Sequence, residues 1–396
     1  MDIHILTILS VAMVIAIAAR RLHLPYTVGL VAVGIVLSFS RFGFGITLTH
    51  DFIFQIILPP LLFESALSLH WRELRADLLP ILTLSTVGTV IGAIAVATGM
   101  VLLLHWPTAP ALVFGILIAA TDPVAVVATF KDNGVKGRLR LLIESESLFN
   151  DGVAAVLFTA LLAWAESGNA LPDFAPTLAG LALTIAGGIA VGLLSGAVAL
   201  GIAGRTADQL VETVLTLVAA YGSFSIAEHL GVSGVLATVS AGLLMGSYAR
   251  IWQGNILNLK GGDFTLSFWE FAAFLANSIV FPLIGTSIAQ RPFAAFGTVP
   301  LLITLALVPL GRALTVYPLS LLFHGSRRAI PLRHQHVLWW GGLRGAMGLA
   351  LALSLPDSLP YRDQIVIATF AAVAFSILLQ GITMPLLLQH LGFLKR

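Results

Sequence analysis

Cysteine is absent from the 396-residue chain, and charged residues make up only 10% of it. Without thiols the protein has no disulfides, no thiolate nucleophile and no cysteine-ligated metal site. A typical soluble domain carries about 25% charged residues, whereas 58% of this chain is hydrophobic. Because so few polar side chains cannot cover a water-soluble globule, the composition indicates an integral membrane protein surrounded by the lipid bilayer.

Several functional signatures are missing as well. The sequence has no basic tract interleaved with aromatic residues, so it gives no indication of nucleic-acid binding. It has neither a His-Glu-x-x-His zinc helix nor a Gly-x-Ser-x-Gly nucleophile turn. The glycines within 341–348 follow no predicted strand, which argues against a nucleotide-binding loop. We therefore expect a protein that is not an enzyme and needs no cofactor.

Long apolar runs dominate what is present. A helix needs about 20 apolar residues to cross a bilayer, and thirteen apolar segments are predicted to be membrane-spanning helices. They cover residues 3–19, 25–39, 52–69, 78–104, 110–130, 142–165, 176–204, 210–229, 233–248, 265–289, 297–323, 335–355 and 364–390. The basic pair Arg20-Arg21 follows the first segment instead of preceding it, which indicates a retained span and not a cleaved signal peptide.

The basic residues predict how these spans are oriented. With the N-terminus outside, sixteen Lys and Arg residues fall in inner loops, and only Arg41, Arg291 and Arg362 fall in outer loops. Such an excess is typical of the cytoplasmic side of a membrane protein. The asymmetry predicts a multi-pass protein of the cell (inner) membrane, with its N-terminus outside and its C-terminus in the cytoplasm.

Thirteen spans divide into six, one and six. We predict a first repeat over 1–165, a linker helix over 176–204 and a second repeat over 210–390, inverted because the linker crosses the membrane once. Pro123 interrupts the fifth span, and the glycines within 341–348 interrupt the twelfth, at equivalent places in the two halves. Paired interrupted helices point to the binding site of a transporter.

Ionisable residues deep in a span are candidate functional groups, because charge is costly there. Asp122 falls near the midplane of the fifth span, within Thr121-Asp122-Pro123. The proline frees backbone carbonyls, and these can coordinate a hard cation together with the Thr121 hydroxyl. Alternatively, the Asp122 carboxylate caps the broken helix. The sequence leaves both roles open.

Asp151 falls near the midplane of the sixth span. Ser147 precedes it by four residues and so shares its helical face, while Glu146 and Asn150 share a neighbouring face by the same spacing. Carboxylate and hydroxyl oxygens together suit a hard monovalent cation. We predict that Asp151 binds the transported ion; the alternative is a protonated acid with a structural role only.

Other charges in the spans require partners. A buried guanidinium needs a carboxylate, and Glu146 or Asp122 can serve Arg344. Glu146 is favoured, so Glu146 and Arg344 are predicted to form a structural ion pair; the alternative is a direct role of Arg344 in transport. Arg312 also needs a partner, which the sequence does not identify. Glu64 falls toward the inner side of the third span, where it either lines a cation-attracting funnel or ligates the ion.

Together these motifs resemble the NhaP/NHE-type sodium/proton antiporters of the cation:proton antiporter superfamily. The resemblance is carried by Thr121-Asp122-Pro123, Glu146-Ser147, Asn150-Asp151, Gly341 to Ala346, Phe63-Glu64 and Leu24-Pro25-Tyr26. It implies an all-α, NhaA-like fold with inverted six-helix repeats and crossing broken helices, a mobile core domain and a homodimer. It further implies Na⁺ ligation by Asp151, Ser147, Thr121 and Glu64, with Asp122 nearby, and the same pairing of Glu146 with Arg344.

The predicted function is secondary active, electroneutral exchange of Na⁺ for protons by alternating access, with a role in pH homeostasis. Because Asn150 precedes Asp151, a single acid stands at that turn, which favours one-for-one exchange. The ligand types do not fix the size of the site, so K⁺/H⁺ exchange is the nearest alternative and Li⁺ is a further candidate cargo. An uncoupled cation channel and a membrane receptor or interaction protein are the other classes considered.

Overall fold

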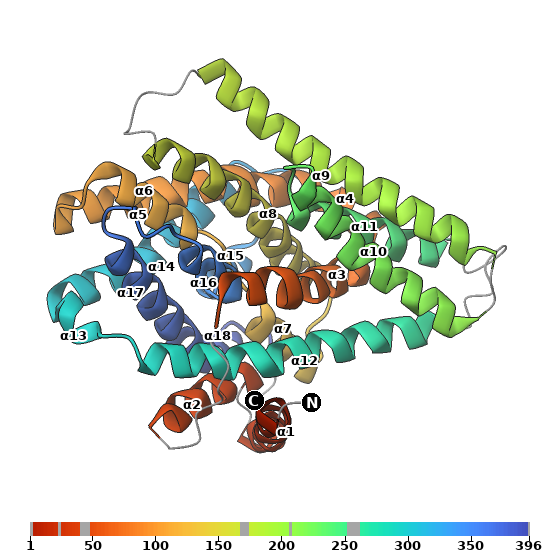
Figure 1. Cartoon of the computed structure of the whole chain (residues 1–396), viewed down its shortest axis with the longest axis horizontal. Coiled ribbons are helices and arrows are strands. Elements are labelled where there is room, and N and C mark those ends of the chain that lie inside the picture. The colour runs from red at the N-terminus through yellow and green to blue at the C-terminus, as the bar shows by residue number, and fades with distance from the viewer. Residues whose placement is uncertain are drawn as a thin grey trace.

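The computed structural model describes residues 3–22, 25–39, 48–166, 174–205, 208–251 and 262–394, and its regular elements in these ranges are all helical (Figure 1). Helices or interrupted helices cover all thirteen predicted spans. Seven helices are long and apolar enough to cross a membrane, and shorter apolar helices accompany them. This confirms the all-α membrane fold. Leu24 and Arg41, used above for the resemblance and the orientation, lie outside the described residues.

The first half of the chain is built from eight α-helices and two π-helical segments. They are α1 (Ile3–Leu22), α2 (Tyr26–Ser38), η1 (Phe52–Ile57), α3 (Leu58–Ser68), α4 (Trp71–Leu82), η2 (Thr83–Val87), α5 (Gly88–Leu104), α6 (Thr108–Leu117), α7 (Val124–Asp132) and α8 (Arg138–Glu166). The segments η1 and α3 form one continuous helix, as do α4, η2 and α5.

The second half begins with the long helix α9. Its elements are α9 (Phe174–Ala203), α10 (Gln209–His229), α11 (Gly234–Ile251), α12 (Gly262–Ala289), α13 (Phe293–Phe296), α14 (Thr298–Leu321), α15 (Leu332–Trp340), α16 (Ala346–Leu353), α17 (Arg362–Phe375), η3 (Ser376–Gln380) and α18 (Gly381–His390). The division into inverted repeats stays a prediction.

Two helices are interrupted, as Pro123 and the glycine cluster predicted. The chain is unwound over 118–123 between α6 and α7, and over 341–345 between α15 and α16. Proline has no N–H to donate and its ring clashes with the preceding turn, so it weakens a helix at that point. The two unwound stretches meet, because the Asp122 N–H donates to the Leu343 carbonyl at 2.8 Å. Four half-helices therefore converge on one place.

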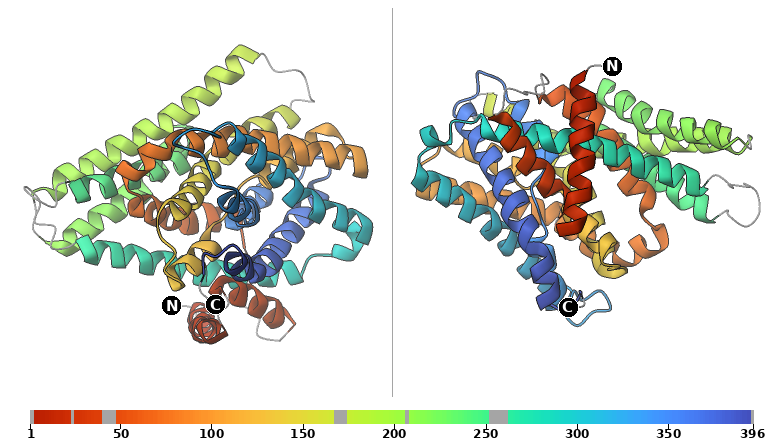
Figure 2. Two further views of the ribbon diagram at one scale, coloured as in Figure 1. Left: turned by 180° about the vertical axis from the view of Figure 1, so that it is seen from behind. Right: turned by 90° about the horizontal axis from the view of Figure 1, so that it is seen from below.

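Close backbone contacts join several of the helices. A Cβ atom added to Gly34 of α2 would lie 2.2 Å from the Pro282 carbonyl oxygen of α12, and one added to Gly192 of α9 would lie 2.1 Å from that of Ala237 in α11. Only glycine permits such approaches, which membrane proteins use for tight helix packing. Figure 2 shows α1 lying outside this group, against α2 and α12.

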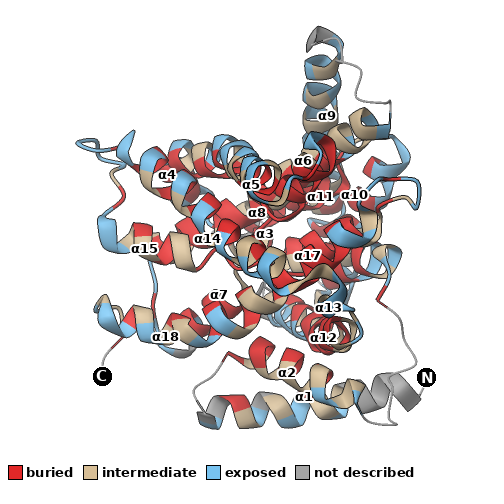
Figure 3. Cartoon of the chain, turned by 90° about the vertical axis from the view of Figure 1, so that its left-hand side faces the viewer, coloured by how far each residue is buried: buried red, intermediate tan, exposed pale blue. Residues whose placement is uncertain are grey.

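Burial follows the arrangement expected of a membrane protein. Buried residues gather around α8, α14 and α17 (Figure 3). Many large apolar residues of the outer helices are exposed. Leu183 and Leu194 of α9 are 69% and 67% exposed, and Met13 of α1 is 59% exposed. Exposed apolar surface on this scale marks a face that contacts lipid or another protein.

Candidate functional site

The centre of the molecule is the place where the broken helices meet. A helix end carries partial charge, positive at the N-terminus and negative at the C-terminus. The Asp122 carboxylate accepts a hydrogen bond from the Val124 N–H at 3.0 Å, at the start of α7. A Cβ atom on Gly345 would lie 2.0 Å from Asp122 Oδ2, so the same carboxylate also lies against the start of α16. The structure thus shows the capping role, and leaves the ligand role a prediction.

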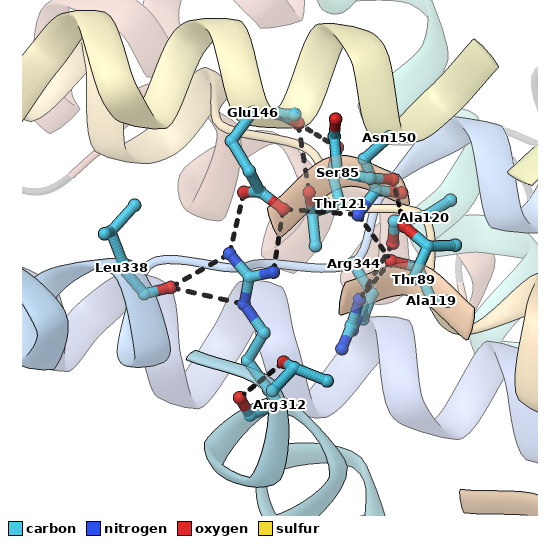
Figure 4. Close-up of polar contacts among 12 residues, drawn as sticks. Ser85, Thr89, Ala119, Ala120, Thr121, Glu146, Asn150, Arg312, Leu338 and Arg344 are labelled. Carbon is cyan, nitrogen blue, oxygen red and sulfur yellow. Dashed lines mark hydrogen bonds and ion pairs between the residues drawn. The ribbon is translucent and has the colours of Figure 1, made fainter. Parts of the chain in front are cut away.

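Arg344 lies at the opposite end of a half-helix. Its Nη1 donates to the carbonyl oxygens of Ala119 and Ala120, at 2.9 and 3.1 Å, where α6 ends (Figure 4). Its backbone N–H donates to Ser376 Oγ of η3 at 2.8 Å. The guanidinium therefore balances the partial negative charge of unpaired carbonyls, and it forms no ion pair with a carboxylate among the residues that the structure describes.

The predicted ion pair of Glu146 with Arg344 is wrong. Glu146 pairs with Arg312 of α14: Arg312 Nη1 donates to Glu146 Oε1 at 2.8 Å and Nη2 to Oε2 at 2.7 Å (Figure 4). The side chains are 7% and 3% exposed. Arg312 also donates to the carbonyl of Leu338, near the end of α15, through Nε at 3.3 Å and Nη2 at 3.2 Å. The missing partner of Arg312 is thus the acid that was assigned to Arg344.

Polar side chains of α8 contact the first break directly. The Thr121 hydroxyl donates to Ser147 Oγ at 3.2 Å, and the Ser147 hydroxyl donates to the Thr121 carbonyl. Asn150 Nδ2 donates to the Ala119 carbonyl at 3.0 Å and to Glu146 Oε1 at 3.4 Å. The structure therefore brings together Thr121, Ser147 and Asn150 of the predicted site, all of them buried.

Asp151 lies one helical turn beyond Ser147 on α8. Its Oδ1 atom is buried and has no hydrogen-bond partner among the described residues. Its charged neighbours are Asp122 and Glu146, both acids. A buried carboxylate oxygen that lacks a donor is costly, and the neighbouring negative charges raise that cost further. Binding of a proton or of a metal cation at Asp151 relieves it.

Glu64 lies apart from the Thr121–Ser147 contact, in the wall of a cavity of about 330 Å³ between α2, α3, α7, α8 and α12. The cavity reaches Pro123, at the break between α6 and α7. Tyr26 lines it as well and lies within electrostatic reach of both Glu64 and Asp122. The cavity therefore extends from Glu64 toward the broken helices.

Two residues of this cavity were overlooked as site residues in the sequence. Tyr26 entered only as part of a motif, and Lys131 only as a basic residue that orients the chain. Lys131 Nζ lies 3.8 Å from Glu64 Oε1. The available signal was its position nine residues after Asp122 on the same interrupted helix.

Comparison with known proteins agrees with this geometry. Residues 7–390 match the family described as "Sodium/hydrogen exchanger, transmembrane". The chain is 39% identical over 391 residues to the Na⁺/H⁺ antiporter ApNhaP of Aphanothece halophytica, covering 98% of this chain and 73% of that protein. It is 34% identical to the Na⁺/H⁺ antiporter NhaP of Pseudomonas aeruginosa, covering 94% and 92%.

A solved structure shares the fold. The sodium proton antiporter MjNhaP1 from Methanocaldococcus jannaschii, solved at pH 8, superposes with a TM-score of 0.77 at 21% sequence identity. The match covers 98% of each chain. It therefore extends over the whole fold, including both interrupted helices.

Proposed function

The chain belongs to the transmembrane sodium/hydrogen exchanger family, and we propose that it exchanges one Na⁺ for one H⁺, with Asp151 holding either ion in turn. Membership of this family makes the chain a membrane transporter and not an enzyme. The observation that carries the proposal is the buried Asp151 Oδ1 atom beside two interrupted helices, which finds no hydrogen-bond donor in the part of the chain that the structure describes.

The coupling follows from the cost of burying charge. An ionised carboxylate in a medium of low dielectric constant is strongly unfavourable unless it is paired. Asp151 is neutral when it holds a proton, and its charge is balanced when it holds Na⁺. Only these two loaded forms cross between the two sides, so each sodium ion that moves one way is matched by a proton that moves the other way.

The ligands proposed for Na⁺ are oxygen atoms around Asp151. Ser147 and Thr121 now satisfy one another by hydrogen bonds, and a bound cation would take those oxygens as ligands. Asp122 holds the half-helix ends together nearby. Asn150 donates to the Ala119 carbonyl. Because residue 150 is an asparagine and not an acid, Asp151 is the single acid of that turn.

The proposed route to the site is the cavity lined by Glu64. Acidic residues in a cleft concentrate cations, and this cavity also contains Glu144 and Glu270. In the predicted orientation it opens toward the cytoplasm, and alternating access then exposes Asp151 to the other side. The same proposal includes inverted repeats, a mobile core, a homodimer, and a cell membrane location with the N-terminus outside.

Electroneutral exchange makes a specific prediction about voltage. In proteoliposomes that contain a pH-sensitive dye, a Na⁺ gradient is expected to drive proton movement at a rate that an imposed potassium–valinomycin potential does not change. One Na⁺ for one H⁺ carries no net charge, whereas each net charge moved across 100 mV is worth about 2.3 kcal/mol.

Matched pulses of Na⁺, Li⁺ and K⁺ in proteoliposomes without valinomycin define the cargo. A strong dependence of the rate on voltage would contradict the stoichiometry. Proton movement driven by K⁺ but not by Na⁺ would show that the substrate is K⁺ and not Na⁺. Cation flux without proton movement would indicate a channel.

A further inference from the structure

One basic side chain lies among the acids of the cavity. Lys131, at the end of α7, has its Nζ 3.1 Å from Glu270 Oε1 of α12 and 3.8 Å from Glu64 Oε1 of α3. All three residues line the cavity. The lysine and Glu270 side chains are 41% and 60% exposed, but the Glu64 side chain only 18%. The ammonium group thus stands between an outer, hydrated acid and an inner, more buried one.

The net charge of the cavity determines what the Lys131 ammonium group can do there. Its other ion pair, Arg140 with Glu144, is closed at 2.7 Å and balances itself. Among the described residues that line the cavity, this leaves Lys131 opposite Glu64 and Glu270, with one net negative charge. A lysine ammonium is a compact point charge on a flexible stem with rotatable donors. It therefore resembles a tethered monovalent cation.

We propose that Lys131 competes with incoming Na⁺ for Glu64, and so sets the Na⁺ concentration at which exchange is half-maximal. This inference rests on the proposed function, in which Na⁺ passes through the cavity to Asp151. When Na⁺ arrives, Lys131 remains with Glu270, its nearer partner, and Glu64 is freed to attract the ion. By pairing with Lys131, Glu270 thus reduces the competition of Lys131 for Glu64.

The proposal predicts opposite effects for two variants. Lys131→Gln removes the competitor and is expected to lower the half-maximal Na⁺ concentration about 3- to 10-fold, with little change in maximal rate, because one positive charge leaves the cavity. Glu270→Gln leaves Lys131 with Glu64 as its remaining partner, and is expected to raise that concentration by a similar factor. The measurement is the initial rate of dye-reported proton movement in proteoliposomes as a function of Na⁺.

The pair of variants separates competition from a simple mechanical link between α7 and α12. Each variant breaks the same Lys131–Glu270 contact, so a mechanical role predicts shifts in the same direction. Lys131→Arg, which keeps the charge, is expected to stay near the wild type. Lys136→Gln is the matched control, because Lys136 is exposed and does not line the cavity.

An unchanged or raised half-maximal concentration for Lys131→Gln overturns the proposal, as do shifts of both variants in one direction. These results leave the proposed function intact, because wild-type liposomes in the same assay exchange Na⁺ for protons. Absence of exchange by the wild-type protein overturns the proposed function and this inference with it. Thermal unfolding of each purified variant identifies any change that comes from misfolding.

Discussion

Asp151→Asn is expected to reduce Na⁺-driven proton movement in proteoliposomes to the level of protein-free vesicles, a loss on the order of 100-fold or more. An asparagine has nearly the same shape as an aspartate, so the packing of α8 is preserved. Its amide neither releases a proton nor balances the charge of a sodium ion. Because no donor in the described ranges reaches Asp151 Oδ1, the substitution breaks no hydrogen bond that the structure shows for that atom.

The matched control is Asp363→Asn. The Asp363 side chain is 84% exposed at the start of α17, where it faces Arg362, so this variant removes one carboxylate outside the site. It is expected to exchange at the wild-type rate. Substantial exchange by Asp151→Asn would contradict the account and would direct attention to Asp122, the neighbouring acid at the helix breaks.

Loss of Arg312 is expected to have the largest effect on stability. Arg312→Gln leaves the Glu146 carboxylate buried without its guanidinium, and breaking a buried ion pair in this way costs about 3–5 kcal/mol. That is a large part of the 5–15 kcal/mol that typically holds a native protein together. The apparent Tm of the purified protein is expected to fall by on the order of 5–10 °C.

A double-mutant cycle tests which arginine pairs with the acid. Glu146→Gln combined with Arg312→Gln removes both charges together and is expected to regain much of the Tm lost by Arg312→Gln alone, because no unpaired charge remains. Glu146→Gln combined with Arg344→Gln is expected to show no such recovery, since Arg344 contacts carbonyls of α6. Recovery in the second pair and not in the first would restore the pairing predicted from the sequence.

The sequence was informative where local chemistry decides the structure. Pro123 removes a backbone donor and its ring clashes with the preceding turn, and both interruptions lie where Pro123 and the glycine cluster predicted them. Helical spacing placed Glu146 and Asn150 on one face, and a hydrogen bond of 3.4 Å joins them. The apolar segments also predicted where the helices lie, because each helix that spans a bilayer requires its own run of apolar residues.

The sequence did not predict which buried charged residues pair with one another. Position along a span gives depth in the membrane, but not which helix lies alongside, and Glu146 had two buried arginines available. Arg344 needs no acid because the bond between Asp122 and Leu343 brings it to the carbonyl end of α6. A half-helix end acts here as the counter-charge, and a sequence does not show which half-helices meet.

Lys131 illustrates the same limit at the cavity. Its sequence context identifies a basic residue near the inner end of the fifth span, which is ordinary for a membrane protein. Its contacts with Glu64 and Glu270 join α7 to α3 and α12, helices from distant parts of the chain. Such a contact depends on tertiary packing and has no local signature.

The most direct test of the account counts the protons that leave when sodium binds. Purified protein is titrated with NaCl by calorimetry in buffers of different ionisation enthalpy, at a pH where the site is still protonated. The wild-type protein is expected to release about one proton for each Na⁺ bound, and Asp151→Asn none, because a single carboxylate exchanges one ion for the other. Sodium binding to the wild-type protein without proton release would contradict the claim that both ions share Asp151.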